Sequence, residues 1–197
     1  MPLYAVSKAV LREVVGYDLH RGCVACAPRP AELPLPLGEL AERGRLRILV
    51  AEGLSDPANI GALLRNARAF AADLVLLDPK GGDPLEPRAI RAAVGNTFVV
   101  PWRRVDLPRA LSELRAALPG LELLAATVGP KATPLHARSL NQLSPPARLA
   151  VLVGNEGAGL SAELLDLADG EVTIPIDPAA DSLNVAAASA LLLYALG

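Results

Sequence analysis

The sequence predicts an α/β fold built on a parallel sheet, and three observations lead to this prediction. Short apolar runs alternate along the chain with stretches of helical periodicity. These runs are apolar almost throughout, which is typical of strands covered on both faces by helices. The length, 197 residues, suits one domain, or one domain with a short appendage.

The main domain is expected over residues 46–197, with buried strands at its apolar runs: 48–50, 74–77, 98–100, 121–126, 149–153 and 172–174. A helix packed on one face is predicted after the first strand, because apolar residues recur there at i, i+3, i+4 and i+7: Ile60, Leu63, Leu64, Ala67 and Phe70. Another helix is predicted over 108–118, and Pro119 and Gly120 stop it.

Residues 1–45 are expected to form a short N-terminal segment and a proline-rich connector. Prolines and glycines follow one another closely in the connector: Pro28, Pro30, Pro34, Pro36, Gly38 and Gly44. This composition is typical of an extended, semi-rigid linker.

The last helix, predicted over 183–196, is apolar on nearly every side. A helix without a polar face must be buried all round. For this helix, such burial requires either a deep internal slot or a partner subunit.

Composition excludes several classes of protein. With 52% hydrophobic and 20% charged residues, the chain is neither disordered nor a coiled coil. The aromatic content of 3% argues against a base-stacking platform, and the net charge of −2 argues against a general nucleic-acid coat, although a local patch stays open. No apolar run reaches the roughly 18 residues of a membrane span. The first residues lack a signal-peptide layout, so a cytosolic protein is expected.

The first of three polar clusters runs from Asp56 to Gly61 and continues with Arg65 and Asn66. It follows a strand and opens a helix, and six residues of helix separate Asn59 from Arg65, a rise of about 9 Å. A functional site is one interpretation. The other makes Asp56 or Asn59 a helix N-cap and Arg65 a solvated surface charge.

The second cluster, residues 153–160, leaves a strand and turns on Gly154, Gly157 and Gly159. Glycines let a ligand approach the backbone closely, but Glu156 would repel a phosphate. The run has neither a P-loop lysine nor dinucleotide-binding spacing. A carboxylate in this turn suits a cationic or hydroxyl-bearing ligand, and an ordinary tight connection between strand and helix is the alternative.

The third cluster is Ile174-Pro175-Ile176, followed by Ser182, Leu183 and Asn184 at the start of the apolar helix. Ser182 could simply cap that helix. An amide such as Asn184, entering an otherwise apolar helix, must find hydrogen-bond partners if buried, which favours a functional role.

Together the clusters read D-P-x-N-x-G-x-x-x-R-N-A, V-G-N-E-G-x-G-L and I-P-I-x(5)-S-L-N-V, in this order. They resemble the three motifs of the SpoU (TrmH) family of RNA 2′-O-ribose methyltransferases, in the SPOUT class. The chain departs from the family at Asn66, where relatives often have Thr, at Ala71, where Gly is usual, and at Pro178, which replaces a common Gly. Residues 16–22 resemble the end of the substrate domain that many relatives carry, so residues 1–45 are expected to hold a truncated remnant of it.

The resemblance implies a parallel-sheet SPOUT methyltransferase domain with a trefoil knot over residues 150–197, a rare exception to the rule against threaded chains. It also implies a homodimer, S-adenosyl-L-methionine as methyl donor, a ribose 2′-hydroxyl of tRNA or rRNA as acceptor, and no metal. The donor's adenosine would bind around Thr127, Val128, Gly129, Gly154, Ile174, Ile176 and Leu183.

The resemblance further implies that Arg65 holds the phosphate beside the acceptor. Because an Arg side chain keeps its proton in proteins, positioning is favoured over proton removal. The polar ring around donor and acceptor would be completed by Asn59, Glu156, Ser182 and Asn184.

Other readings stay open. The spacing of His20, Cys23 and Cys26 resembles that of metal ligands, but a structural zinc normally takes four ligands. The two cysteines are therefore expected to act as small buried hydrophobic residues. Two alternatives to a ribose methyltransferase stay open. One is a non-catalytic RNA-binding or ribosome-assembly protein that keeps the fold, and the other is a SPOUT enzyme that methylates a base.

Overall fold

The computed structural model describes residues 2–16, 22–129, 131–136, 147–177, 179–180 and 182–196, and the chain divides into two compact units. The first unit, Met1–Ala31, contains helix α1 (Lys8–Val15). This helix begins at the N-cap Ser7 and ends at Gly16, where φ is 78°. None of its residues is buried, so α1 contributes no apolar core to this unit.

Cys23 and Cys26 are both exposed, so the prediction that they are small buried hydrophobes is wrong. The physical reason is that α1 has no buried face against which they could pack. His20 lies outside the described residues.

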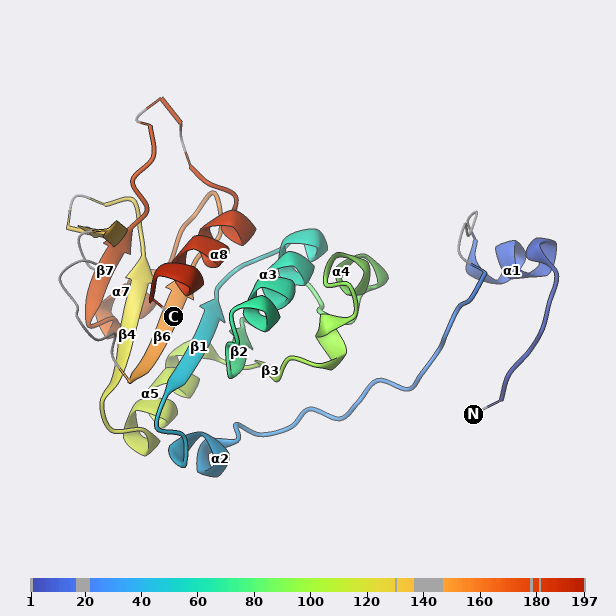
Figure 1. The fold of residues 1–197 in the computed structure, drawn as a ribbon, viewed down its shortest axis with the longest axis horizontal. Coiled ribbons are helices and arrows are strands. Elements are labelled where there is room, and N and C mark those ends of the chain that lie inside the picture. The colour runs from blue at the N-terminus through green and yellow to red at the C-terminus, as the bar shows by residue number, and fades with distance from the viewer. Residues whose placement is uncertain are drawn as a thin grey trace. The chain divides into compact units, whose positions relative to one another are not determined.

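The second unit, Glu32–Gly197, is built on a sheet in which the described residues form seven strands, all paired in parallel, in the order β3-β2-β1-β6-β4-β7-β5 (Figure 1). The strands are β1 (Leu46–Ala51), β2 (Leu74–Leu77), β3 (Trp102–Arg104), β4 (Leu121–Ala126), β5 (Thr133–Pro134), β6 (Arg148–Val153) and β7 (Gly170–Thr173). The helices are α2 (Leu37–Ala41), α3 (Pro57–Ala69), α4 (Pro87–Ala92), the 3-10 helix η1 (Asn96–Phe98), α5 (Leu107–Ala117), α7 (Ala162–Leu167) and α8 (Val185–Leu196). The α/β fold with a parallel sheet is therefore confirmed.

Helices cover both faces of the sheet. Successive residues of a strand point to opposite faces, so neighbouring residues pack against different helices. Leu49 of β1 packs in the core formed with α3 and α8. Its neighbours Ile48 and Val50 pack in the core formed with α2, α5 and α7. In Figure 1, α3 and α8 lie in front of the sheet and α5 lies behind it. No helix of the described residues is long and apolar enough to cross a membrane.

Five of the six predicted strands are confirmed to within two residues at each end, but the strand predicted over 98–100 is wrong. Gly95 adopts φ 81° and η1 follows, so the chain turns where a strand was expected. The strand comes later, at β3, where Trp102 pairs with Val75. Within the predicted run only Val100 is buried.

Helix α3 begins within the first polar cluster, as the sequence predicted. Asp56 is its N-cap, and its side chain accepts a hydrogen bond from the N–H of Ala58 at 3.0 Å. Gly61 lies where α4 crosses α3, and a Cβ added there would lie 2.3 Å from the carbonyl oxygen of Ala89. The glycine thus permits a close contact between the two helices.

Helix α8 is apolar as predicted, but the residues that the structure describes cover only one side of it. Ser189, Leu192 and Leu193 are buried, and Asn66 of α3 donates hydrogen bonds to Ala186 O at 2.6 Å and to Ser189 Oγ at 3.0 Å. The opposite side is exposed, with Leu191 44% and Tyr194 76% accessible. An internal slot alone therefore does not provide the all-round burial that the sequence predicted.

Candidate functional site

One residue from each of the three polar clusters meets in a hydrogen-bonded group. Asn59 Nδ2 donates to Glu156 Oε1 at 2.6 Å, and Asn184 Nδ2 donates to Glu156 Oε1 at 3.2 Å and to Asn59 Oδ1 at 2.9 Å. We call Asn59, Glu156 and Asn184 the amide–carboxylate cluster. It joins the start of α3, the turn after β6 and the start of α8.

Asn184 also ends the chain segment that leads into α8. Its Oδ1 accepts the N–H of Ala186 at 3.0 Å, so this amide caps the helix. The alternative in which Ser182 is the cap is wrong, because α8 begins at Val185. Asn184 is exposed, and its Nδ2 bonds the polar side chains of Asn59 and Glu156 rather than groups in an apolar core.

The glycine turn after β6 is held by Asn155. Its Oδ1 accepts the N–H groups of Gly157 and Ala158 at 2.8 and 3.1 Å, and its Nδ2 donates to Gly53 O at 2.9 Å. A Cβ at Gly154 would lie 2.2 Å from the carbonyl carbon of Gly159. The turn therefore closes only with glycine at position 154.

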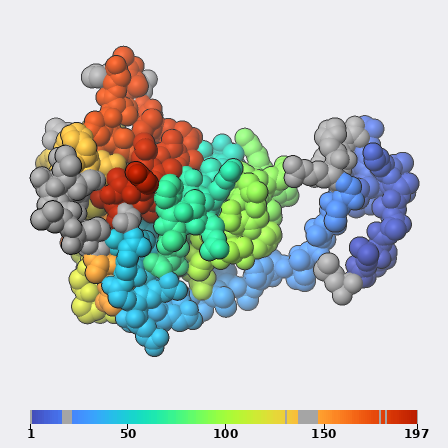
Figure 2. Space-filling view, viewed as in Figure 1, coloured from blue at the N-terminus to red at the C-terminus, as the bar shows by residue number. Residues whose placement is uncertain are grey.

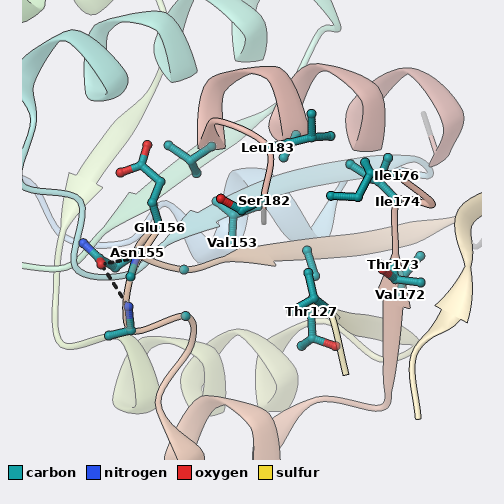
Figure 3. Close-up of a pocket in the computed structure, with 18 residues that line it drawn as sticks. Thr127, Val153, Asn155, Glu156, Val172, Thr173, Ile174, Ile176, Ser182 and Leu183 are labelled. Carbon is teal, nitrogen blue, oxygen red and sulfur yellow. Dashed lines mark hydrogen bonds between the residues drawn. The ribbon is translucent and has the colours of Figure 1, made fainter. Parts of the chain in front are cut away.

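A cavity of about 430 Å³ opens beside this turn, at the carboxyl ends of β4, β6 and β7 (Figure 3). In open α/β sheets, ligands bind outside the carboxyl ends of the strands. In Figure 3, Glu156 and Ser182 project on one side of the hollow, and Ile174 and Ile176 lie on another. The lining residues are Ala126, Thr127, Val128, Val153, Gly154, Asn155, Glu156, Gly157, Ala158, Gly159, Val172, Thr173, Ile174, Ile176, Ser182, Leu183, Val185 and Ala188.

Most residues expected to bind the donor line this cavity: Thr127, Val128, Gly154, Ile174, Ile176 and Leu183. Gly129 does not line it. A Cβ added at Gly129 would lie 3.6 Å from Glu171 Oε2, the carboxylate that accepts a hydrogen bond from Thr127 Oγ1 at 2.8 Å.

Of the residues expected to act on the acceptor, only some line the cavity. Glu156 and Ser182 line the cavity, whereas Asn59 and Asn184 reach it only through their bonds to Glu156. Arg65 is exposed on α3, and its side chain makes no hydrogen bond or ion pair with any residue that the structure describes.

Two residues that shape the site, Asn155 and Glu52, were not among those predicted from the sequence. Glu52 Oε2 accepts the N–H of Ser161 at 2.7 Å and so fixes the far end of the glycine turn. Asn155 carried a usable signal, because Asn beside glycines commonly hydrogen-bonds the backbone two residues on. Glu52 carried none, since its partner lies 109 residues away.

This arrangement suits a ligand with an apolar, flat part and a cationic or hydroxyl-bearing part. Apolar walls from Val153, Val172 and Ile174 would cover the former, and the Glu156 carboxylate would face the latter. Among the residues that the structure describes, no three His, Cys, Asp or Glu side chains gather in a way that could hold a metal ion.

The fold and this site define an α/β protein with a ligand cavity in its C-terminal part, and comparison with known proteins identifies the class. The chain belongs to the SpoU rRNA methylase family, whose model matches residues 46–194. It is 38% identical over 98% of its length to an uncharacterized tRNA/rRNA methyltransferase of Mycobacterium tuberculosis, and covers 65% of that protein.

A second relative is the 23S rRNA (guanosine(2553)-2′-O)-methyltransferase RlmP of Bacillus subtilis, 33% identical over 76% of this chain and 57% of RlmP. Among solved structures, the AdoMet-bound rRNA methyltransferase from Sinorhizobium meliloti matches with a TM-score of 0.72 and 27% identity, over 82% of this chain and 59% of that one. The chain thus spans about two thirds or less of the length of these relatives.

Proposed function

We propose that this chain is an S-adenosyl-L-methionine-dependent RNA methyltransferase that methylates a ribose 2′-hydroxyl of tRNA or rRNA. The observation that carries the proposal is the amide–carboxylate cluster at the mouth of a glycine-bordered cavity. Three segments far apart in the sequence supply one polar side chain each to this point. Membership of the SpoU family and the AdoMet-bound neighbour support the choice of donor and reaction.

The cavity residues fit this methyl donor. Its adenine would lie between apolar walls that include Ile174 and Ile176, and backbone groups near Thr127 would meet its polar edge. Gly154 allows the turn to close beside it. The donor also carries a sulfonium cation, and a carboxylate such as Glu156 attracts positive charge.

When bound, the donor would supply an activated methyl group to the ribose 2′-oxygen, the hydroxyl proton would pass to solvent, and S-adenosylhomocysteine would be left as the product. The protein's main task is then to hold the two reactants in line. Asn59 and Asn184 fix the Glu156 carboxylate by hydrogen bonds to one of its oxygens. Ser182, exposed at the cavity rim, offers a hydroxyl to the ligands.

Arg65 is proposed to hold the phosphate next to the acceptor ribose. It lies six residues after Asn59 on the same helix, a rise of about 9 Å. A guanidinium without a partner in the described chain is available for a bidentate contact to a phosphate.

Two finer features belong to the same proposal. Residues 150–197 would form a trefoil knot, which is supported by a chain path that runs from β6 to β7 and then back to α8 beside β6 and α3. Two copies of the chain would form a homodimer through α8 and α3, which is supported by the exposed apolar side of α8.

The first test is calorimetric titration of the folded chain with S-adenosyl-L-methionine and with S-adenosylhomocysteine. We expect saturable binding of both. A folded chain that binds neither would contradict the enzyme proposal and favour an RNA-binding protein that only keeps the fold.

The second step separates ribose from base methylation. RNA from a strain that lacks the protein is incubated with the chain and labelled donor, and the methylated position is mapped. A methyl group on a 2′-oxygen is the expected result. Label on a base would replace the proposal by the base-methyltransferase alternative.

A further inference from the structure

Two segments that pack together are rich in arginine and contain no acidic residue. Between positions 57 and 72 and between 87 and 105 there is neither Asp nor Glu, although the whole chain has a net charge of −2. These segments contain Arg65, Arg68, Arg88, Arg91, Arg103 and Arg104. The positive charge is thus concentrated on one part of an otherwise slightly acidic protein.

The two segments form one continuous surface. Helices α3 and α4 meet at Gly61, where an added Cβ would lie 2.6 Å from the Cβ of Ala92. Near the start of α3, Arg88 Nη1 lies 3.5 Å from Asp56 Oδ1. Figure 2 shows the teal atoms of α3 adjoining the green atoms of the segment after α4. We call this surface, formed by α3, α4 and η1, the arginine face.

Arg88 pairs with Asp56, and the other five arginines of these segments fall into two groups. Arg103 and Arg104 donate hydrogen bonds to backbone carbonyls, including Pro34 O at 2.9 Å and Pro79 O at 2.6 Å, and so hold the edge of the sheet. Arg65, Arg68 and Arg91 are exposed, and their side chains have no hydrogen bond or ion pair with any described residue. Charge that no acidic group compensates attracts a polyanion.

Exposed apolar side chains stand on the same surface. Phe98 is 70% exposed, and Val94 and Val99 are exposed beside it. Val94 has φ 53°, a conformation that is costly for a β-branched residue. A single exposed ring on a surface that also carries arginines can stack on a nucleic-acid base. The low aromatic content is compatible with one such contact, although it excludes an extended stacking platform.

The arginine face begins at the candidate site, because Asn59 of the amide–carboxylate cluster belongs to α3. We infer that the face binds the RNA strand that flanks the methylated nucleotide. Arg68 and Arg91 contact phosphates beyond the one assigned to Arg65, and Phe98 stacks on a base. This inference rests on the proposed function, since RNA is the substrate assumed there.

The test compares an arginine-face variant with a matched control. In the double variant Arg68→Gln/Arg91→Gln, two positive charges are lost from the face. The control is Arg109→Gln on α5, in the helical layer on the other side of the sheet, where Arg109 pairs with Glu113 at 2.9 Å. The dissociation constant of each protein for a fluorescein-labelled pool of 20-nucleotide single-stranded RNA is measured at several salt concentrations.

We expect the double variant to bind RNA on the order of tenfold more weakly at 0.1 M salt, and its salt slope to fall by about 1.4, because each lost phosphate contact contributes about 0.7 for a single strand. Phe98→Ala should weaken binding by roughly fivefold or more without changing the slope, since stacking releases no counterion. The Arg109→Gln control should match the parent in both quantities.

Donor binding serves as the check on folding in every variant. If the double variant binds S-adenosyl-L-methionine like the parent and also keeps the parent's RNA affinity and salt slope, the inference is overturned, and the face serves another partner such as a protein. Failure of the proposed function gives a different result, namely a parent protein that transfers no methyl group to RNA.

Discussion

Arg65 is the site residue whose role depends most on a molecule outside the chain. Asn59, Glu156 and Asn184 have one another as partners, whereas the Arg65 side chain has none among the described residues. If Arg65 anchors RNA phosphate, Arg65→Ala should leave donor affinity nearly intact and reduce methyl transfer by about a hundredfold or more, the usual cost of a lost transition-state contact. Single-turnover methylation of the native RNA measures the loss.

Arg65→Lys is the informative companion variant. Lysine keeps the charge but lacks the planar fork that fixes a phosphate by two bonds, so it should restore little of the lost rate. A surface charge without a role would instead give near-normal turnover and a change in unfolding free energy within about 0.5 kcal/mol. An Arg65→Ala rate within about twofold of the parent would make Arg65 only a solvated side chain.

Single residues show how far the sequence defined the candidate site. The motifs contained Asn59, Glu156 and Asn184, and the structure brings these three together across sequence separations of 97 and 125 residues. Their mutual hydrogen bonds could not be predicted, because they depend on where the strand ends meet. The cap of α8 was misjudged for a local reason: the helix starts after Asn184, two residues later than a Ser182 cap would require.

At the scale of elements, the contact between α3 and α4 depends on Gly61. In Gly61→Ala the new methyl group would lie 2.3 Å from Ala89 O and 2.9 Å from Ala93 N, both backbone atoms that cannot move aside easily. Overpacking of this kind costs about 1–3 kcal/mol, against a gain in helix propensity of about 1 kcal/mol. Because a contact of 2.3 Å with a backbone atom is severe, we expect the upper end of this cost and a net loss of roughly 2 kcal/mol in the free energy of unfolding, measured by urea denaturation.

Gly38→Ala in α2 provides the matched control. It is also a helical glycine, but an added Cβ would meet nothing within 4 Å. The same substitution should therefore raise the unfolding free energy, by about 0.5–1 kcal/mol. Equal effects at the two positions would show that the α3–α4 contact does not depend on a glycine.

Whether an element could be predicted depended on how deeply it is buried. Strands such as β1 and β6, which are covered on both faces, produced apolar runs that identified them. The error at 98–100 arose because Phe98 and Val99 are apolar but exposed, so hydrophobicity there does not report burial. Backbone conformation explains one departure from the family motif. Ala71 has a φ of 53°, which favours glycine, and this accounts for the Gly that is usual at this position in the family.

At the scale of the whole molecule, the exposed side of α8 is an apolar surface on which a second copy of the chain could pack. Leu191 and Tyr194 stand on this side, and the Tyr194 ring makes an edge contact with Phe70, with centroids 6.3 Å apart. Leu192 is a poor probe of association, because it is fully buried within the chain's own core. A charge at Leu192 would disturb folding, whereas a charge at Leu191 would disturb only a partner that packs there.

The homodimer proposal therefore predicts that Leu191→Lys converts a dimer into a monomer, because burying an unpaired ammonium group in an apolar interface is costly. Light scattering at micromolar concentration should give twice the chain mass for the parent and the chain mass for the variant, with unchanged circular dichroism. Leu33→Lys, a charge placed at another exposed leucine, should remain dimeric. A parent that is monomeric, or a Leu191→Lys variant that stays dimeric, would contradict a dimer formed through α8, and the apolar side of this helix would then require a different partner.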